Sequence, residues 1–231
     1  MKRITEIDLF RFTAILLMVI FHIVYDLNEF MGIDINYEVG FWYYIGKVSG
    51  LLFIIVAGIS SNLGKSPIKK ALKLYIFASI ITIISFIFFK EEYIRFGILH
   101  FLATMTLLSV VLNKLNTYWL ILIQLIAYFL YRITQSIKIT NPFLIPFGFT
   151  YYGFVSVDYY PIFPYIIYYI LGIFIFRLVY KRGNRILPFE VKSKCIEFIS
   201  RRSLEIYLLH QPLILVILYS IKLLQKLTFL A

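Results

Sequence analysis

The first apolar stretch of the chain reads Glu6-Ile-Asp8-Leu-Phe-Arg11-Phe-Thr-Ala-Ile-Leu-Leu-Met-Val-Ile-Phe-His22-Ile-Val-Tyr-Asp26. It is long enough to cross a membrane, yet it contains acidic residues, an arginine and a histidine. A helix advances about 100° per residue, so Arg11 and His22 lie about three full turns apart on one face, and Asp8 and Asp26 share that face. Charged groups cost about 2.5–3.5 kcal/mol each at the centre of a membrane helix, so they normally face a protein interior or a wet cavity. The stripe therefore predicts the wall of a functional site.

The composition is that of a membrane protein. The 231 residues are 61% hydrophobic and 15% charged, whereas a soluble domain carries about 25% charged residues. The net charge of +11 is spread over short basic clusters between apolar runs. This is the pattern of membrane loops, so we expect no nucleic-acid partner. The single cysteine, Cys195, excludes an internal disulfide and a cysteine-based metal cluster, and no other metal-binding spacing is present.

Seven apolar windows of about twenty residues predict transmembrane helices. They lie at residues 7–28, 41–62, 70–89, 96–113, 117–135, 160–180 and 203–224. The fifth window is the weakest because Gln124, Arg132 and Gln135 dilute its end, and six or eight spans stay open alternatives. We therefore expect an all-α membrane protein, a polytopic helical bundle of about seven transmembrane helices in a single domain over residues 1–231.

The distribution of Lys and Arg predicts the orientation of these spans. If the spans alternate in direction, fourteen Lys and Arg lie in connections on one side and six on the other. Cytoplasmic loops carry the excess of positive charge. The N-terminus is therefore expected in the cytoplasm and the C-terminus outside, in a multi-pass protein of the plasma membrane. The sequence is also compatible with a homodimer.

All three histidines, His22, His100 and His210, lie in predicted spans. A lone buried histidine most often makes a packing hydrogen bond. His22 differs because Asp26 follows four residues later, where a carboxylate fixes the tautomer of an imidazole that acts as a general base. Depths counted along the spans place His22 and His100 in the outer third and His210 nearer the cytoplasm.

Arg11 and Asp8 form the second candidate group, near the cytoplasmic end of the first span. Arg11 either snorkels to the surface with Asp8 as its ion-pair partner or offers a guanidinium fork to an anionic substrate. Thr5 and Asp8 also have the spacing of a capping box that begins the helix.

Three further polar residues are candidates for contacts with the acceptor substrate. They are His100, Asp158 and Glu205. Asp158 precedes the sixth span and either caps a helix or faces an outer pocket. Gly97, just before His100, permits close approach of another helix. Glu205 needs a partner within the membrane.

His210 completes this acceptor-side group, and its neighbour Pro212 predicts a local kink. Proline cannot donate to the carbonyl of Leu208, which leaves that acceptor free beside His210.

The longest outer connection, about 136–159, is aromatic and interrupted by proline and glycine, so it should not form a regular helix. Two interpretations stay open. The connection either rests in the aromatic belt of the interface or covers an external pocket as a lid.

Six short motifs, in the same order along the chain, resemble the heparan-alpha-glucosaminide N-acetyltransferase-like branch of transmembrane acyltransferases, in particular its small prokaryotic members. The motifs are Glu6-Ile-Asp8-x-x-Arg11, Phe21-His22-x-x-Tyr25-Asp26-Leu, Phe53-x4-Gly58-Ile-Ser60, Arg95-Phe-Gly97-Ile-Leu-His100, Asp158-Tyr-x-Pro161-x-x-Pro164 and Ser203-Leu-x-Ile-Tyr207-Leu-Leu-His210-Gln-Pro212. The spacing between Arg11 and His22 is also similar to a signature of the wider acyltransferase superfamily.

The resemblance implies an enzyme that moves an acyl group, acetyl above all, from cytoplasmic acyl-CoA to an acceptor at the external face. An amino sugar or a sugar hydroxyl is the implied acceptor. Arg11 and Asp8 would bind the donor, His22 with Asp26 would be catalytic, and no metal is implied. The lysosomal branch uses a histidine in its first external loop; residues 29–40 contain none here, so the role falls to His22.

Two other classes of function fit the same polar residues. A transporter or proton-coupled flippase also uses intramembrane His, Asp and Glu side chains. A non-catalytic membrane subunit would keep the fold without the chemistry. Binding of CoA separates the enzyme from the transporter, because a transporter has no need of it.

The orientation is tested by reporter fusions at the two termini. We expect a cytoplasmic signal from the N-terminal fusion and an external signal from the C-terminal fusion. A cytoplasmic C-terminus would mean that the number of spans is wrong by an odd number.

Overall fold

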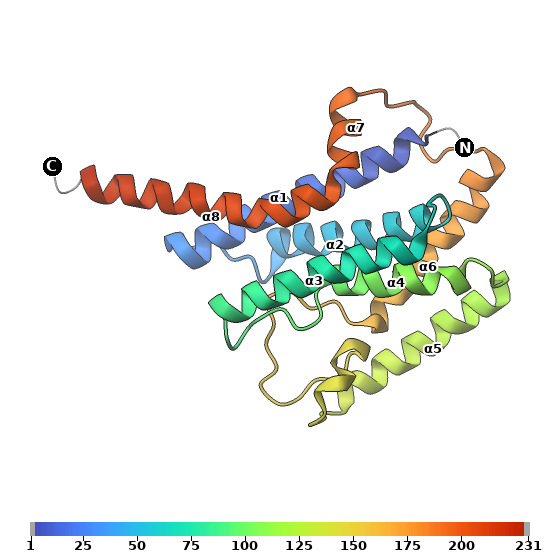
Figure 1. Cartoon of the computed structure of the whole chain (residues 1–231), viewed down its shortest axis with the longest axis horizontal. Coiled ribbons are helices and arrows are strands. Elements are labelled where there is room, and N and C mark those ends of the chain that lie inside the picture. The colour runs from blue at the N-terminus through green and yellow to red at the C-terminus, as the bar shows by residue number, and fades with distance from the viewer. Residues whose placement is uncertain (1–2, 229–231) are drawn as a thin grey trace. The chain divides into compact units, whose positions relative to one another are not determined.

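The computed structural model describes residues 3–228, and this part of the chain is helical without β-strands (Figure 1). The α-helices are α1 (Thr5–Met31), α2 (Gly40–Ser61), α3 (Pro67–Phe88), α4 (Ile98–Leu112), α5 (Thr117–Ser136), α6 (Ile162–Leu178), α7 (Lys194–Arg201) and α8 (Ser203–Thr228). Two 3-10 turns, η1 (Pro142–Phe147) and η2 (Tyr180–Arg182), complete the described elements.

The predicted fold class is confirmed. Six helices, α1, α2, α3, α5, α8 and the combined segment Ile162–Arg182, are long and apolar enough to cross a membrane, and α4 is a shorter apolar helix. Each of the seven predicted spans coincides with one of these helices to within a few residues. The weakest window forms a complete helix of 20 residues, α5. The orientation of the helices in the membrane stays a prediction.

The structure divides into two compact units that meet within α2. One unit comprises Met1–Phe53 and Arg185–Ala231, and we call it the terminal unit because it joins the two ends of the chain. The other, Ile54–Asn184, is the central unit. The expected single domain over the whole chain stays a prediction.

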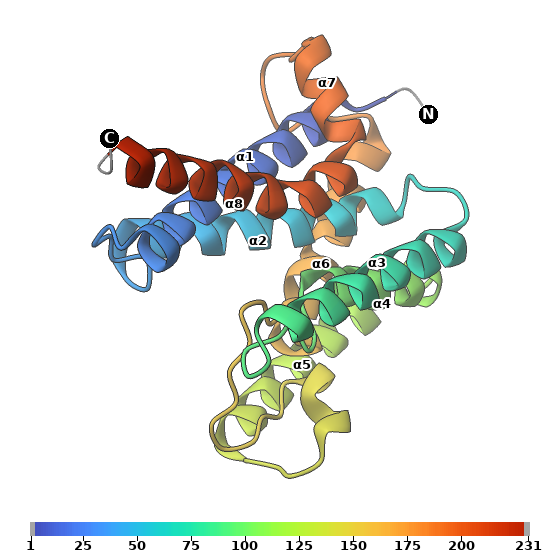
Figure 2. The same cartoon turned by 60° about the vertical axis from the view of Figure 1, so that its left-hand side comes forward.

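In the terminal unit, α1 and α8 lie side by side and run in the same direction (Figures 1 and 2). Two contacts along their length show this register. Gln211 of α8 bonds Asp26 of α1, and further along both helices the Tyr219 ring lies 6.3 Å from the Phe30 ring. Residues late in the chain therefore face the second half of α1.

The central unit is held by a close approach of α2 and α6. A Cβ atom on Gly58 would overlap the carbonyl oxygen of Tyr169, and one on Gly172 would overlap that of Ile55. Only glycine permits this separation, which accounts for Gly58 in the third motif. Gln124, which weakened the fifth window, donates a hydrogen bond of 2.9 Å to the carbonyl of Ile167 on α6.

The connection between α5 and α6 contains no α-helix among its described residues, as predicted. Its one regular element is the 3-10 turn η1, which begins at Pro142 and contains a second proline, Pro146. The Tyr159 hydroxyl donates a hydrogen bond of 2.7 Å to the carbonyl of Ile145. This bond holds the turn against the segment before α6. Phe143 and Tyr152 are exposed, which suits both the interface belt and the lid, so the two interpretations stay open.

Candidate active site

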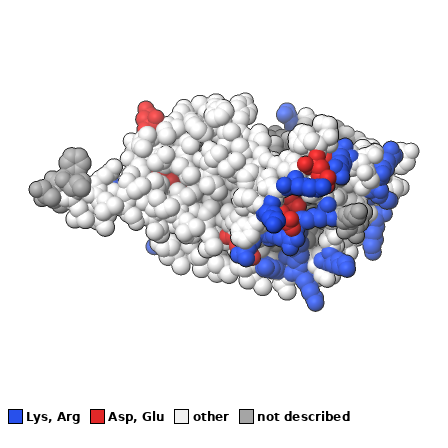
Figure 3. Space-filling model, turned by 90° about the horizontal axis from the view of Figure 1, so that it is seen from above, with Lys and Arg blue, Asp and Glu red and all other residues white. Residues whose placement is uncertain are grey.

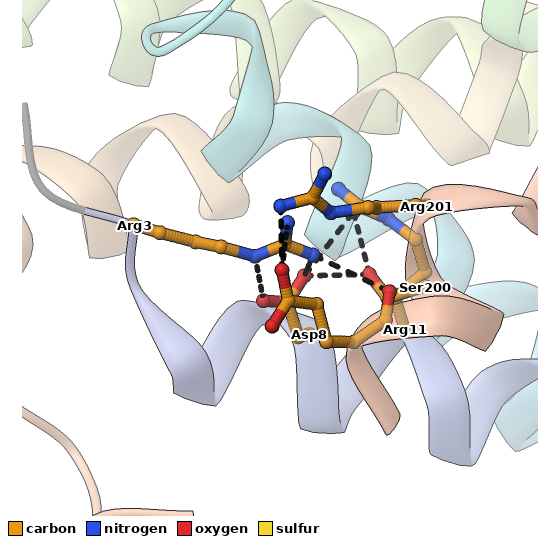
Figure 4. A network of polar contacts seen from close by, with 6 residues as sticks. Arg3, Asp8, Arg11, Ser200 and Arg201 are labelled. Atoms are coloured by element: carbon orange, nitrogen blue, oxygen red, sulfur yellow. Dashed lines mark hydrogen bonds and ion pairs between the residues drawn. The ribbon is translucent and has the colours of Figure 1, made fainter. Parts of the chain in front are cut away.

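The first polar group of the terminal unit surrounds Asp8, whose carboxylate is buried (Figure 4). Arg3 donates to both of its oxygens, with the Nη2–Oδ1 contact at 2.9 Å. The Ser200 hydroxyl donates to Oδ1 at 2.7 Å and accepts a bond of 2.9 Å from Arg11 Nη1. Arg11 Nη1 also lies 3.9 Å from Asp8 Oδ1. Asp8 therefore holds two guanidinium groups at the start of α1.

The ion-pair interpretation of Asp8 is thus supported, with Arg3 as its nearer partner. The hydrogen bond that Arg3 donates to Asp8 raises the pKa of Arg3, which stays charged. The expected capping box is wrong: Ile4 occupies the N-cap position, and no side chain caps the helix there. Asp8 is drawn instead toward Arg3 and Ser200, which supply stronger partners than a backbone N–H.

The short helix α7 extends this network. Its Glu197 accepts two hydrogen bonds, one of 3.0 Å from Arg3 Nη1 and one of 2.5 Å from Arg201 Nη2. Ser193 begins the helix as N-cap and accepts a bond from the Ile196 N–H. Residues 181–202 separate the last two predicted spans, and α7 is an amphipathic helix within them. We call Arg3, Asp8, Arg11, Glu197, Ser200 and Arg201 the arginine network.

A cavity of about 260 Å³ opens beside the arginine network. It is lined by Thr5, Asp8, Val191, Lys192, Ser193, Lys194, Ile196 and Glu197. Pockets for whole small ligands usually exceed about 300 Å³, so this one suits a group the size of a phosphate. Figure 3 shows Lys and Arg side chains gathered toward the right of the face seen from above, with Asp and Glu side chains among them. The cavity itself is lined by two lysines, Lys192 and Lys194, and by two acidic residues, Asp8 and Glu197.

Glu6 fixes the backbone of the segment that leads to this cavity. Its buried carboxylate accepts hydrogen bonds from the N–H groups of Ile186 and Leu187, at 3.1 and 2.9 Å. Further along, Glu190 pairs with Lys192 at 3.1 Å and Arg185 at 3.6 Å. The hydrogen bond from Lys192 and the nearby positive charges lower the pKa of Glu190. The sequence placed Glu6 in the first motif but indicated no role for it, because its partners are backbone groups distant in sequence.

The second polar group lies further along α1, where His22 meets His210 of α8. Their ring centroids are 4.7 Å apart, with an interplanar angle of 62°. Asp26 is fully buried, and both of its oxygens accept from Gln211 Nε2, at 2.7 and 3.0 Å. We call these four residues the imidazole cluster.

The imidazole cluster contains several buried polar atoms without a hydrogen-bond partner in the described part of the chain. They are His22 Nδ1, His210 Nε2 and Gln211 Oε1. Buried polar groups are normally bonded, and their exceptions gather at binding and catalytic sites. The imidazole cluster is therefore the strongest candidate for a reaction centre in the terminal unit.

Two expectations for this region change. His210 does not lie at a different level from His22, because α7 lies outside the span and α8 begins part-way along α1 rather than beside its start. Asp26 bonds Gln211 rather than His22. The helix α8 continues through Pro212, and the local kink there stays a prediction.

His100 and Asp158 lie in the central unit. His100 Nε2 is 3.4 Å from the Thr82 hydroxyl on α3, and its ring lies 5.6 Å from that of Phe96. Asp158 Oδ2 accepts a hydrogen bond of 3.0 Å from the N–H of Ile98 and so caps α4. A Cβ atom on Gly97 would overlap this carboxylate. Gly97 therefore admits Asp158, and the expectation of an approaching helix is wrong.

Glu205 is exposed on the first turn of α8. A carboxylate there interacts favourably with the positive end of the helix dipole. Within residues 3–228, no three His, Cys, Asp or Glu side chains are grouped so that they could hold a metal ion.

Comparison with known protein families finds one match, to the model described as heparan-alpha-glucosaminide N-acetyltransferase, catalytic. The match covers residues 3–212 and so includes the arginine network and the imidazole cluster. No curated protein and no solved structure matches the chain.

Proposed function

Because the chain belongs to the heparan-alpha-glucosaminide N-acetyltransferase catalytic family, we propose that it transfers an acetyl or other acyl group from cytoplasmic acyl-CoA to an acceptor at the external face. The acceptor is an amino sugar or a sugar hydroxyl. One observation carries the proposal: α1 and the segments packed on it hold the guanidinium groups of Arg3 and Arg11 at one end and two imidazoles with unbonded nitrogens further along.

The arginine network suits the nucleotide end of the donor. CoA carries phosphates, and guanidinium groups bind phosphate oxygens through paired hydrogen bonds. Arg11 is about a quarter exposed although it contacts Asp8 and Ser200. The cavity beside it adds the ammonium groups of Lys192 and Lys194. Both features support binding of the donor from the side on which α1 begins.

The separation of the two groups fits a long, thin donor. Arg11 and His22 lie about 16 Å apart along a helix of 1.5 Å rise per residue. The nucleotide would stay at the arginine network while the thioester reaches the imidazole cluster.

The reaction then needs one base. His22 takes the proton from the amine or hydroxyl of the acceptor as that atom attacks the thioester carbonyl. The carbon–sulfur bond breaks, CoA leaves as its thiolate, and the proton returns to the thiolate or to solvent. Asp26 supports this step by holding Gln211, and with it α8, against α1. The role of His100 or Asp158 in orienting the acceptor stays a prediction.

Substitution of Arg11 tests the donor site. Arg11→Lys keeps the charge but loses the guanidinium fork, so affinity for CoA should fall several-fold while the protein stays folded. Isothermal titration of the purified protein with CoA measures this. Arg132→Lys on α5 is the matched control and should bind CoA as the wild type does. Unchanged affinity in Arg11→Ala would reduce Arg11 to a membrane anchor.

Substitution of His22 tests the chemistry. Purified protein is incubated with acetyl-CoA labelled in the acetyl group and with glucosamine or a membrane glycan extract, and labelled product is measured. His22→Ala should lower the rate by at least about 100-fold, the contribution of a general base, and should leave CoA binding nearly intact. Ser49→Ala, which removes a buried hydroxyl that donates to the carbonyl of Ala14, is the control.

The outcomes of this assay separate the rival functions. A wild-type protein that neither binds CoA nor forms product would favour the transporter or the non-catalytic subunit. A His22→Ala variant within a few-fold of the wild-type rate would remove His22 from the mechanism.

A further inference from the structure

We propose that His210, rather than Asp26, orients His22, by accepting a hydrogen bond from Nδ1–H of His22 at its own Nε2 atom. The inference rests on the proposed function, in which His22 is the base. It assigns a positioning role to a residue that sequence reasoning placed at another level of the membrane.

The tautomer of His210 follows from its contact with its own helix. His210 Nδ1 lies 2.6 Å from the backbone carbonyl oxygen of Tyr207. A carbonyl oxygen only accepts, so the Nδ1 atom carries the hydrogen. In the neutral ring, Nε2 then carries a lone pair and is an acceptor. This atom is buried without a partner within residues 3–228.

A matching donor lies on α1. His22 Nδ1 is also buried without a hydrogen-bond partner in that range. The ring centroids are 4.7 Å apart and the rings meet edge to face. Because the contact with Tyr207 holds the His210 ring, formation of the bond requires the His22 ring to turn toward His210 Nε2. One bond from His22 Nδ1–H to His210 Nε2 would satisfy both atoms.

Asp26 is unsuited to this orienting role in the observed arrangement. Both of its oxygens accept from the Gln211 amide, at 2.7 and 3.0 Å. Asp26 and Gln211 instead fix the register of α1 against α8. That register in turn sets His210, the residue before Gln211, against His22.

The consequence for the reaction is a defined base. With hydrogen fixed on Nδ1, neutral His22 keeps its lone pair on Nε2, which is the nitrogen left to take the proton of the acceptor. After the transfer, both ring nitrogens of His22 carry hydrogen, and His210 Nε2 keeps accepting from Nδ1–H. The orienting logic is that of a triad in which an imidazole replaces the carboxylate.

Two substitutions of His210 separate positioning from packing. Gln places an oxygen near the position of Nε2 and can still accept from His22, whereas Asn reaches only the position of Nδ1. His210→Gln should therefore keep kcat within about tenfold of wild type, and His210→Asn should lose about 100-fold, the scale of a misplaced base. Both should bind CoA as the wild type does. Equal kcat values for the two folded variants would overturn the inference.

A second measurement does not depend on the folding of the His210 variants. Nitrogen-15 spectra of the wild-type protein labelled at its three histidines report which ring nitrogen carries hydrogen, and His22→Ala identifies the signals of His22. We expect the Nδ1–H tautomer for His22. The Nε2–H tautomer would overturn the inference. Failure of the wild type to transfer acetyl groups would instead contradict the proposed function and leave this spectrum unchanged.

Discussion

The terminal unit depends on one constraint, the burial of three carboxylates along a helix that crosses the membrane. Glu6, Asp8 and Asp26 are all buried on α1, and an unpartnered buried charge costs several kcal/mol. Each finds a partner late in the chain: backbone N–H groups at 186–187, Ser200 and Gln211. The last part of the chain must therefore return to α1, and in doing so it brings His210 to His22.

The same constraint connects structure to function. Asp8 holds Arg3 and Arg11 at the start of α1, while Asp26 and Gln211 fix the level at which the two imidazoles meet. The arginine network and the imidazole cluster thus lie along one helix, with Arg11 and His22 about 16 Å apart for an eleven-residue separation. Such an arrangement suits a donor with a charged nucleotide at one end and a thioester at the other.

Hydropathy and charge were sufficient to predict all seven apolar helices, because the bilayer fixes both length and composition. They were not sufficient for the partners of the polar residues. The spacing of His22 and Asp26 suggested a direct bond, yet Gln211, distant in sequence, competes for Asp26. The level of His210 could not be counted from the start of its span, because α7 shifts where α8 begins. Glu6 gave no signal because backbone N–H groups are its partners.

The parallel register of α1 and α8 is the central claim, and cross-linking of paired cysteines in native membranes tests it most directly. In a Cys195→Ser background, a bifunctional thiol reagent that spans about 10 Å should join the pair Phe30→Cys with Tyr219→Cys, since the rings of Phe30 and Tyr219 lie 6.3 Å apart and a direct disulfide needs closer Cβ atoms. The pair Phe30→Cys with Leu209→Cys, shifted by about 15 Å along α8, should not. A cross-link in the shifted pair, or none between positions 30 and 219, would contradict the register and the meeting of the two imidazoles.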